Sequence, residues 1–441
     1  MNSSPAFSLR PVLGFLHRWV GLFTAGFLVV SGLTGSVISW DHELDDLLNP
    51  QLMHAQAKGP PLPALDLARA IEARDPRVQV TYLPLAAVPG GTLAFGVEPR
   101  RDPRTGRLFE PGYNQVFIDP ATGAEQGRRA WGAVWPITRE TFVSFLYVLH
   151  YSLHLPRMWG VDRWGVWLMG AVAVLWTIDC LVGAYLTLPR REGPGFWSRW
   201  GPAWRIKTSG SAYRINFDLH RAFGLWLWGV LFTVAFTAFS LNLYGEVFYP
   251  LMSRVSQVTP GPFDLRTPAA RDAPIPPFRS YAQVIEAAKG EARGRGWTDP
   301  AGSAFYEPAY GVYGVAFHAP GGDHGAGGVG PPYLYYDGRS GRLVGERRPW
   351  AGTAADIFVQ AQFPLHSGRI LGTPGRILIS ATGLAVAALS VTGVVIWARK
   401  RWARLGRRGG IDERGWPCNR RRRHSERKGP SASAVGAPGN R

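Results

Sequence analysis

The chain has 441 residues, of which 46% are hydrophobic and only 18% are charged. The formal net charge is +18, and most of that excess lies in residues 398–441. We interpret this basic tail as a disordered anchor beside anionic lipid, and we expect no nucleic-acid partner. Cys180 and Cys418 are the only cysteines, which excludes a disulfide scaffold, a Cys-ligated zinc site and an iron–sulfur cluster.

Four apolar stretches are long enough to cross a bilayer, which takes about 20 helical residues. They cover residues 19–40, 164–188, 223–244 and 377–397. The first lacks a small-residue cleavage site before the acidic segment that follows, so we predict an uncleaved anchor. The lipid bilayer is therefore the first predicted partner, and a soluble cytosolic enzyme is excluded.

Positive charge predicts the direction of the spans. The loop 189–216 has six Lys or Arg and one acidic residue, and the tail is more basic still, whereas residues 41–162 and 245–369 are nearly balanced. Because basic loops stay on the cytoplasmic side, both termini and the short loop are predicted to be cytoplasmic. The two long segments are then predicted to lie outside.

The chain carries an internal duplication. Leu16-His17-Arg18 opens the first span and Leu219-His220-Arg221 opens the third. In each external segment a predicted short helix, at 65–74 or 281–293, precedes a strand that runs into an Asp-x-x-x-Gly turn at Asp119 or Asp337. Leu153-His154 and Leu365-His366 match just before the second and fourth spans. Each half is therefore predicted as a helix out, an external α+β domain, an interfacial segment and a helix back.

This arrangement gives a predicted fold class and a domain plan. The class is a membrane α-helical protein with four transmembrane helices in two parallel repeats and two periplasmic α+β domains, whose sheets we expect to be small and antiparallel. The predicted segments are 1–40 with the first span, 41–141, 142–163, 164–188, 189–216, 217–244, 245–357, 358–397 and the tail 398–441.

In these motifs and their ordered repetition, residues 9–402 resemble the PepSY-associated transmembrane family. That family comprises bacterial inner-membrane proteins tied to iron acquisition, including haem-containing ferric-siderophore reductases. The resemblance implies PepSY-like external domains, an inner-membrane location and a ferric siderophore or other Fe(III) chelate as substrate.

Matched histidines suggest a cofactor. His17 and His220 lie at the cytoplasmic ends of spans one and three, and His154 and His366 lie on the external side. Two imidazoles from facing helices supply both axial ligands of a b-type haem, so the pattern favours two bis-His haems. His150 lies one helical turn before His154, and the choice between them stays open, although symmetry favours His154 because Gln362 occupies the counterpart of His150. A structural role as interfacial anchors is the alternative.

Several other residues are candidates for supporting roles. Arg18, Arg221, Arg157 and Arg369 would pair with haem propionates or extend to lipid phosphates. Asp179 is an ionisable residue inside span two, where charge is costly, and the sequence indicates no partner for it. Tyr306, Tyr313, Tyr335 and His318 would receive a bulky chelate or, alternatively, simply pack on a sheet.

The histidine pattern thus predicts a redox path across the membrane, and the resemblance implies an oxidoreductase that passes the electrons to an external Fe(III) chelate. Another external acceptor, such as a metal oxide, a quinone or a sulfur compound, would suit the same histidines. The sequence has no dinucleotide or phosphate-binding fingerprint, and the cytoplasmic loop is too short for a flavin domain, so a separate, unidentified electron donor is required. The alternative is a haem-free binding or regulatory module that assists a protease or a siderophore transporter.

Overall fold

The computed structural model describes residues 9–190 and 195–409, with side chains up to 405. The chain divides into two compact units between Val394 and Val395, so the last helix contributes to both. Most of the basic tail, from residue 410 on, lies outside the described residues.

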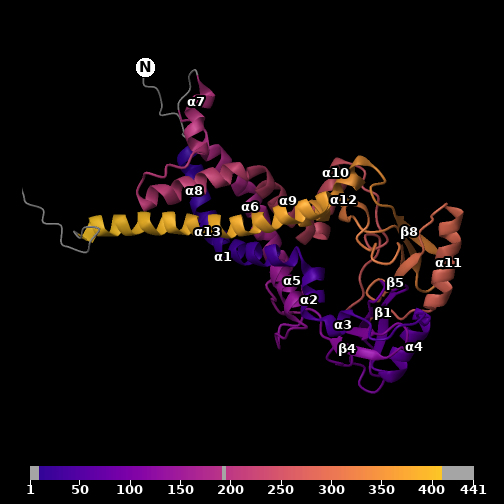
Figure 1. Ribbon diagram of the computed structural model, residues 1–441. Coiled ribbons are helices and arrows are strands. Elements are labelled where there is room, and N and C mark those ends of the chain that lie inside the picture. Colours follow the sequence, from indigo (N-terminus) through magenta and orange to yellow (C-terminus); the bar gives the residue numbers. More distant parts are fainter. Residues whose placement is uncertain (1–8, 191–194, 410–441) are drawn as a thin grey trace, which may run out of the picture. The chain divides into compact units, whose positions relative to one another are not determined.

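Three described helices are long and apolar enough to cross a membrane (Figure 1). They are α1 (Leu9–Ile38), α6 (Trp164–Thr187) and α13 (Gly372–Gly409). A fourth crossing is made if the pair α8 (Ala212–Trp226) and α9 (Trp228–Asn242) counts as one span, and this pair is bent by 71°. The third span, predicted as one helix, is therefore broken at Leu227, and glycines at 224 and 229 flank the break.

The spanning helices share a core. Leu28, Val172, Leu231 and Val386, one from each of α1, α6, α9 and α13, form one buried apolar cluster. Ser36 donates a hydrogen bond to the Ser380 carbonyl at 2.8 Å, which ties α1 to α13. A Cβ at Gly32 would come within 2.5 Å of the Gly383 carbonyl, so only glycine permits this approach of the two backbones.

Shorter helices connect the spans to the rest of the chain. In chain order they are α2 (Asp41–Leu48), α3 (Pro50–Met53), α5 (Phe142–Ser152), α7 (Phe196–Trp200), the 3-10 turn η1 (Gly201–Trp204), the π-turn η2 (Tyr244–Phe248), α10 (Tyr249–Val255), the 3-10 turn η3 (Ala326–Gly328), α12 (Ala354–Ser367) and the 3-10 turn η4 (Arg369–Leu371). Two helices begin earlier than the predicted plan has them: α12 begins before residue 358, and α8 of the broken third span begins inside the predicted loop 189–216.

The two external segments build one sheet instead of two. Its strands are antiparallel in the order β4-β3-β2-β1-β5-β6-β7-β8. The central pairing joins β1 to β5, with Tyr82 opposite Phe305. Each half would otherwise expose a strand edge, and pairing the two edges satisfies their backbone groups. The strands are β1 (Val78–Pro84), β2 (Leu93–Pro99), β3 (Gln115–Ile118), β4 (Glu125–Arg129), β5 (Ala301–Glu307), β6 (Val312–Phe317), β7 (Tyr333–Asp337) and β8 (Leu343–Arg347).

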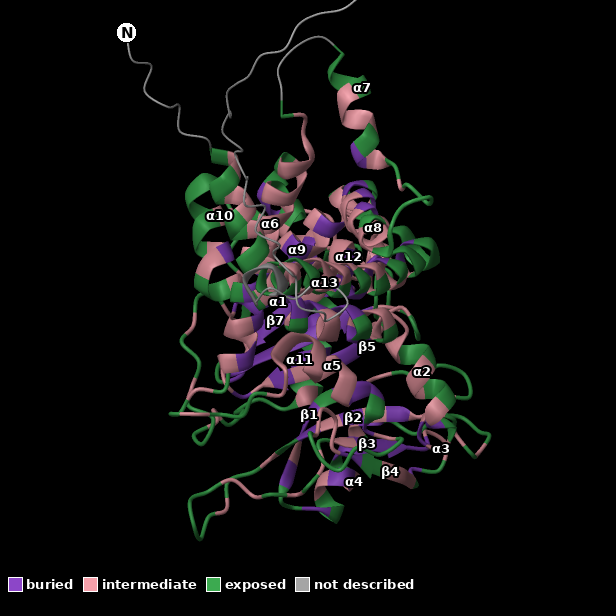
Figure 2. Cartoon of the chain, turned by 90° about the vertical axis from the view of Figure 1, so that its left-hand side faces the viewer, coloured by how far each residue is buried: buried purple, intermediate pink, exposed green. Residues whose placement is uncertain are grey.

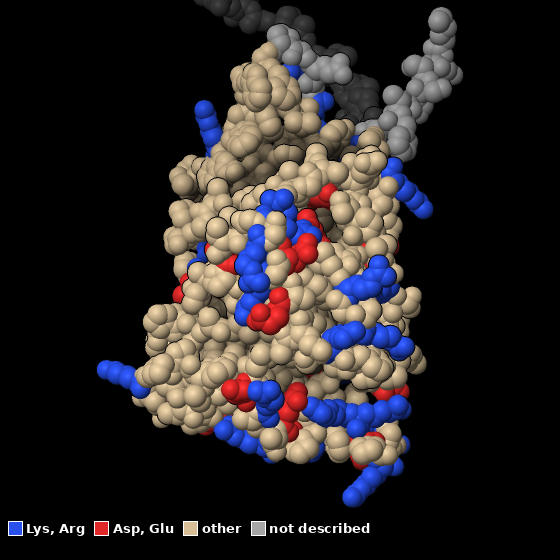
Figure 3. All heavy atoms as spheres, turned by 90° about the vertical axis from the view of Figure 1, so that its right-hand side faces the viewer, with Lys and Arg blue, Asp and Glu red and all other residues tan. Residues whose placement is uncertain are grey.

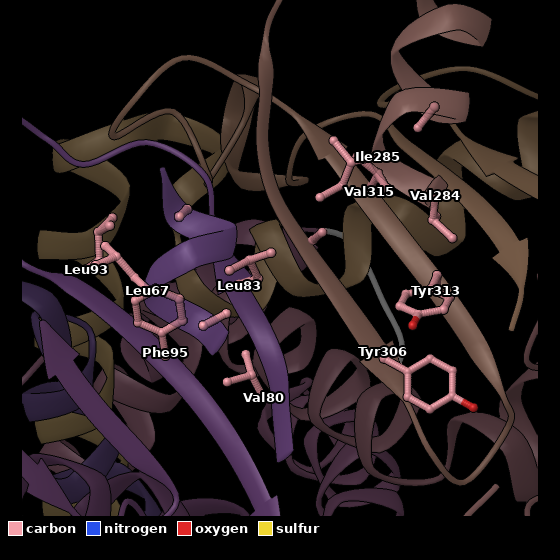
Figure 4. Packing of buried hydrophobic residues seen from close by; sticks show 14 of the residues in the cluster. Leu67, Val80, Leu83, Leu93, Phe95, Val284, Ile285, Tyr306, Tyr313 and Val315 are labelled. Carbon is pink, nitrogen blue, oxygen red and sulfur yellow. The ribbon is translucent and has the colours of Figure 1, made fainter. Parts of the chain in front are cut away.

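Two helices bury one face of this sheet. α4 (Ala64–Arg74) and α11 (Tyr281–Gly294) match the predicted helices, and each contributes apolar residues to a single core with the strands (Figure 4). Leu67 from α4 and Val284 from α11 lie in this core, and many strand residues are buried (Figure 2). On the face that Figure 3 shows, acidic and basic side chains are interspersed, as the nearly balanced charge of residues 41–162 and 245–369 predicts.

The predicted Asp-x-x-x-Gly turns close both outer hairpins. Asp119, which follows β3, and Asp337, the last residue of β7, each accept backbone hydrogen bonds. Gly123 and Gly341 complete the turns at φ angles of 70° and 73°, which glycine adopts without steric cost.

Candidate functional site

The inner pair of matched histidines comes together. The ring centroids of His17 on α1 and His220 on α8 are 6.3 Å apart, with the planes inclined at 58°. His17 Nδ1 lies 2.8 Å from Oδ1 of Asp179 on α6. His220 Nδ1 lies 3.1 Å from both the Leu389 carbonyl and Thr392 Oγ1 on α13. Helices from both halves of the chain therefore build this site.

The outer pair consists of His150 and His366. Their ring centroids are 6.1 Å apart, again with planes inclined at 58°. His150 Nδ1 is 2.9 Å from the Ser31 carbonyl and 3.1 Å from Thr34 Oγ1 on α1. His366 Nδ1 is 3.0 Å from Thr237 Oγ1 on α9.

His154, which symmetry favoured, lies elsewhere. α5 ends at Ser152, and both Leu153 and His154 have positive φ angles, so the chain turns back. The His154 ring stacks on Phe145 at 4.6 Å, and its Nε2 bonds to the Phe145 carbonyl at 2.9 Å. The preference for His154 as partner of His366 is thus corrected to His150. The left-handed turn at Leu153 ends α5 before His154, so the His154 ring packs on Phe145 and not beside His366.

The two halves of the chain contribute hydrogen-bond partners from equivalent positions. Thr34 follows His17 at the same spacing along the chain as Thr237 follows His220, and each threonine contacts the outer histidine beside its helix. On α6, Asp179 and, one helical turn later, Gly183 both lie beside His17. On α13, Leu389 and Gly393 have the same spacing and lie beside His220. The duplication therefore extends from the histidines to the residues that contact them.

The hydrogen bonds define which ring nitrogen is free. A carbonyl can only accept, so Nδ1 of His150 and of His220 donates to it. Thr237 donates its own proton to the Thr233 carbonyl at 2.7 Å and therefore accepts from His366. Among the described residues no hydrogen bond involves Nε2 of the four paired histidines, so each neutral ring keeps its Nε2 lone pair for another ligand.

Glycines make room for three of these rings. A Cβ on Gly35 would lie 2.8 Å from Cε1 of His150, and one on Gly393 would lie 3.2 Å from Cε1 of His220. For Gly183 and His17 the distance is 3.4 Å. The glycine-rich spans thus place imidazoles directly against neighbouring helix backbones.

The donor set fits a haem iron. A b-type haem would be held by one neutral imidazole nitrogen on each of its two faces. Each site brings two imidazoles together, with ring centroids 6.3 Å and 6.1 Å apart, and leaves their Nε2 atoms without a hydrogen bond among the described residues. No group of three or more His, Cys, Asp or Glu suited to a metal is found in the described part of the chain, whereas a haem needs only two axial residues.

The predicted arginines have other neighbours. Arg221 bonds to Asp218 at 2.8 Å and to the Pro202 carbonyl at 2.7 Å. Arg369 bonds to Asp41 at 3.1 Å and to His324 at 2.6 Å. Arg157 bonds to the Gly160 carbonyl, and Arg18 is exposed. Contacts with protein groups therefore hold Arg221 and Arg369 in place.

Two of the predicted substrate residues are buried in the sheet core. Tyr306 and Tyr313 are 3% and 1% exposed, and their hydroxyls donate to the carbonyls of Ile275 and Arg279. They cannot reach an external chelate, so this prediction is wrong for them, because β5 and β6 point them toward α11. Tyr335 lies on the opposite face of the sheet and packs against Phe263.

The fourth predicted substrate residue, His318, is only partly buried. It follows β6, where Nδ1 lies 2.8 Å from the Ala319 carbonyl and Nε2 lies 3.4 Å from Ser303 Oγ.

Comparison with known proteins identifies the family. The family model of the PepSY-associated TM region matches residues 15–400. The chain belongs to this family. It is accordingly a membrane protein with transmembrane helices, as the resemblance implied. A search of curated proteins found no match.

Sequence reasoning missed the residues that orient the imidazoles. Asp179 was noted but had no visible partner, and Thr34, Thr237 and Thr392 were not singled out. Equal spacing of Thr34 and Thr237 from the matched histidines was the available signal. The contribution of the Leu389 and Ser31 carbonyls has no sequence signal, because every residue has a carbonyl.

Proposed function

We propose that this PepSY-associated protein is an inner-membrane di-haem b electron-transfer protein. His17 and His220 would hold an inner haem, and His150 and His366 an outer one. The observation that carries the proposal is the pairing of two imidazoles at each site, with ring centroids 6.3 Å and 6.1 Å apart, while their Nδ1 atoms are bonded to the neighbouring helices.

The chain's own residues would hold and orient the axial ligands. The Nδ1 contacts select the tautomer with a free Nε2 lone pair and prevent the rings from rotating. A haem held by two imidazoles would supply reversible one-electron transfer in preference to oxygen binding. His17 and Thr34 mark the two sites along α1, and the helix between them is roughly 25 Å long, so the pair of sites would cover most of a bilayer.

The proposed reaction is reduction of a ferric siderophore or other Fe(III) chelate at the periplasmic face. Electrons would come from an unidentified donor on the cytoplasmic side. Family membership supports this substrate class, and the paired histidines support the electron path. Reduction to Fe(II) weakens the hold of hard oxygen ligands, so the metal would leave the chelator.

A visible absorption spectrum of the detergent-purified protein tests the proposal. We expect a Soret band, sharp α and β bands after dithionite reduction, and two haems per chain. His17→Ala and His366→Ala should each lose one haem, whereas His42→Ala, which changes an exposed histidine, should keep both. A colourless protein from haem-replete cells would refute the proposal and favour the haem-free binding module.

A further inference from the structure

The four paired histidines differ in one respect, the charge of the group that accepts from Nδ1. His17 faces the carboxylate of Asp179 at 2.8 Å, whereas His220, His150 and His366 face carbonyl or hydroxyl oxygens. The Asp179 side chain is 14% exposed, so solvent screens it weakly. Its counterpart in the second half is Leu389, which contributes only a backbone carbonyl. The inner site therefore has a carboxylate that the outer site lacks.

A carboxylate acceptor changes the ligand that it contacts. Hydrogen bonds to ionised acceptors are roughly twice as strong as neutral ones. A stronger pull on the Nδ1 proton makes Nε2 a more basic donor, and a more basic donor favours Fe(III) over Fe(II). The negative charge acts in the same direction, because Fe(III) carries one more positive charge than Fe(II).

We propose that Asp179 is a positioning residue that makes the inner site the lower-potential one, and so directs electrons outward. This inference rests on the proposed di-haem function. His17 and His220 would hold a haem that takes one electron from a donor of the reduced-flavin or quinol class. The haem held by His150 and His366 would receive that electron, so the inner haem would be reoxidised as the outer one is reduced, and no proton would need to move. Under this arrangement the transfer toward the sheet domain is downhill.

Potentiometric titration of the full-length haem-loaded protein, followed in the α-band region, tests the inference. Wild type should show two components, and His17→Ala, which removes the inner haem, should lose the lower one. In Asp179→Asn the lower potential should rise by at least 59 mV, a tenfold change in the one-electron equilibrium between the sites. Asp179→Glu should restore most of the difference, and Thr392→Val, which removes a neutral acceptor from His220, should shift it much less.

A second variant applies the same physics to the outer site. Thr237→Asp places a carboxylate beside His366, and we expect the higher potential to fall while the lower one is unchanged. This test holds even if Asp179→Asn fails to assemble.

The inference is overturned if both components move together, if Asp179→Asn leaves the gap unchanged, or if His17→Ala removes the higher component. Purification of the wild-type protein without any haem would instead refute the proposed function, so the two failures are distinguishable.

Discussion

Gly35 offers a sharp test of how tightly the outer site is packed. Its Cα faces the His150 ring, and an added Cβ would lie 2.8 Å from Cε1 and 3.3 Å from Nδ1. The ring would have to retreat by about 0.6 Å to reach ordinary van der Waals contact. That movement stretches the hydrogen bonds from Nδ1 to Ser31 and Thr34, which are 2.9 Å and 3.1 Å long.

The expected magnitude comes from two opposing effects. Replacing glycine by alanine inside a helix stabilises it by about 0.5–1 kcal/mol. Overpacking a tight contact costs about 1–3 kcal/mol. Gly35→Ala should therefore be destabilising overall. Gly26→Ala, on the same helix, meets nothing within 4 Å and should be neutral or stabilising. Gly183→Ala, with a 3.4 Å contact to His17, should fall between them.

Apparent Tm in detergent and haem content per chain are the measurements. Gly35→Ala should lower both, with the haem loss confined to the outer site, whereas Gly26→Ala should lower neither. Equal behaviour of the two variants would refute the close packing of His150 on α1.

Two further predictions concern the outer site and the sheet. His150→Ala should remove one haem per chain while His154→Ala should keep both, as measured by the pyridine haemochrome assay, and the reverse pattern would restore His154 as the ligand. Burial alone would raise the pKa of Asp337, but hydrogen bonds from Ser340 and the ion pair with Arg266 outweigh it and lower the pKa from 3.8 to about 2. The depressed pKa stabilises the fold above about pH 4, and this contribution is lost as the pH falls toward 2. The free energy of unfolding that Asp337→Asn loses relative to wild type should therefore shrink over that range in acid-unfolding curves. A loss independent of pH would contradict this.

Much of the architecture followed from local patterns. The length of the apolar stretches predicted the first, second and fourth spans, and a strand that runs into an Asp-x-x-x-Gly turn predicted the hairpins at Asp119 and Asp337. Helical spacing predicted α4 and α11. These features depend on residues close together in the chain, so the sequence alone indicates them. The duplication similarly indicated that His17 and His220 would be neighbours.

Tertiary structure decided the rest. Joining two predicted sheets through β1 and β5 depends on edge strands more than 200 residues apart, and no local pattern encodes that pairing. The choice of His150 over His154 depends on an αL turn at Leu153, a residue type that rarely adopts it. Asp179 contacts His17 because α6 packs against α1. Tyr306 is buried in the core that the sheet shares with α11, so it is not available to an external chelate. In each case the contact joins distant segments, and packing rather than local propensity determines it.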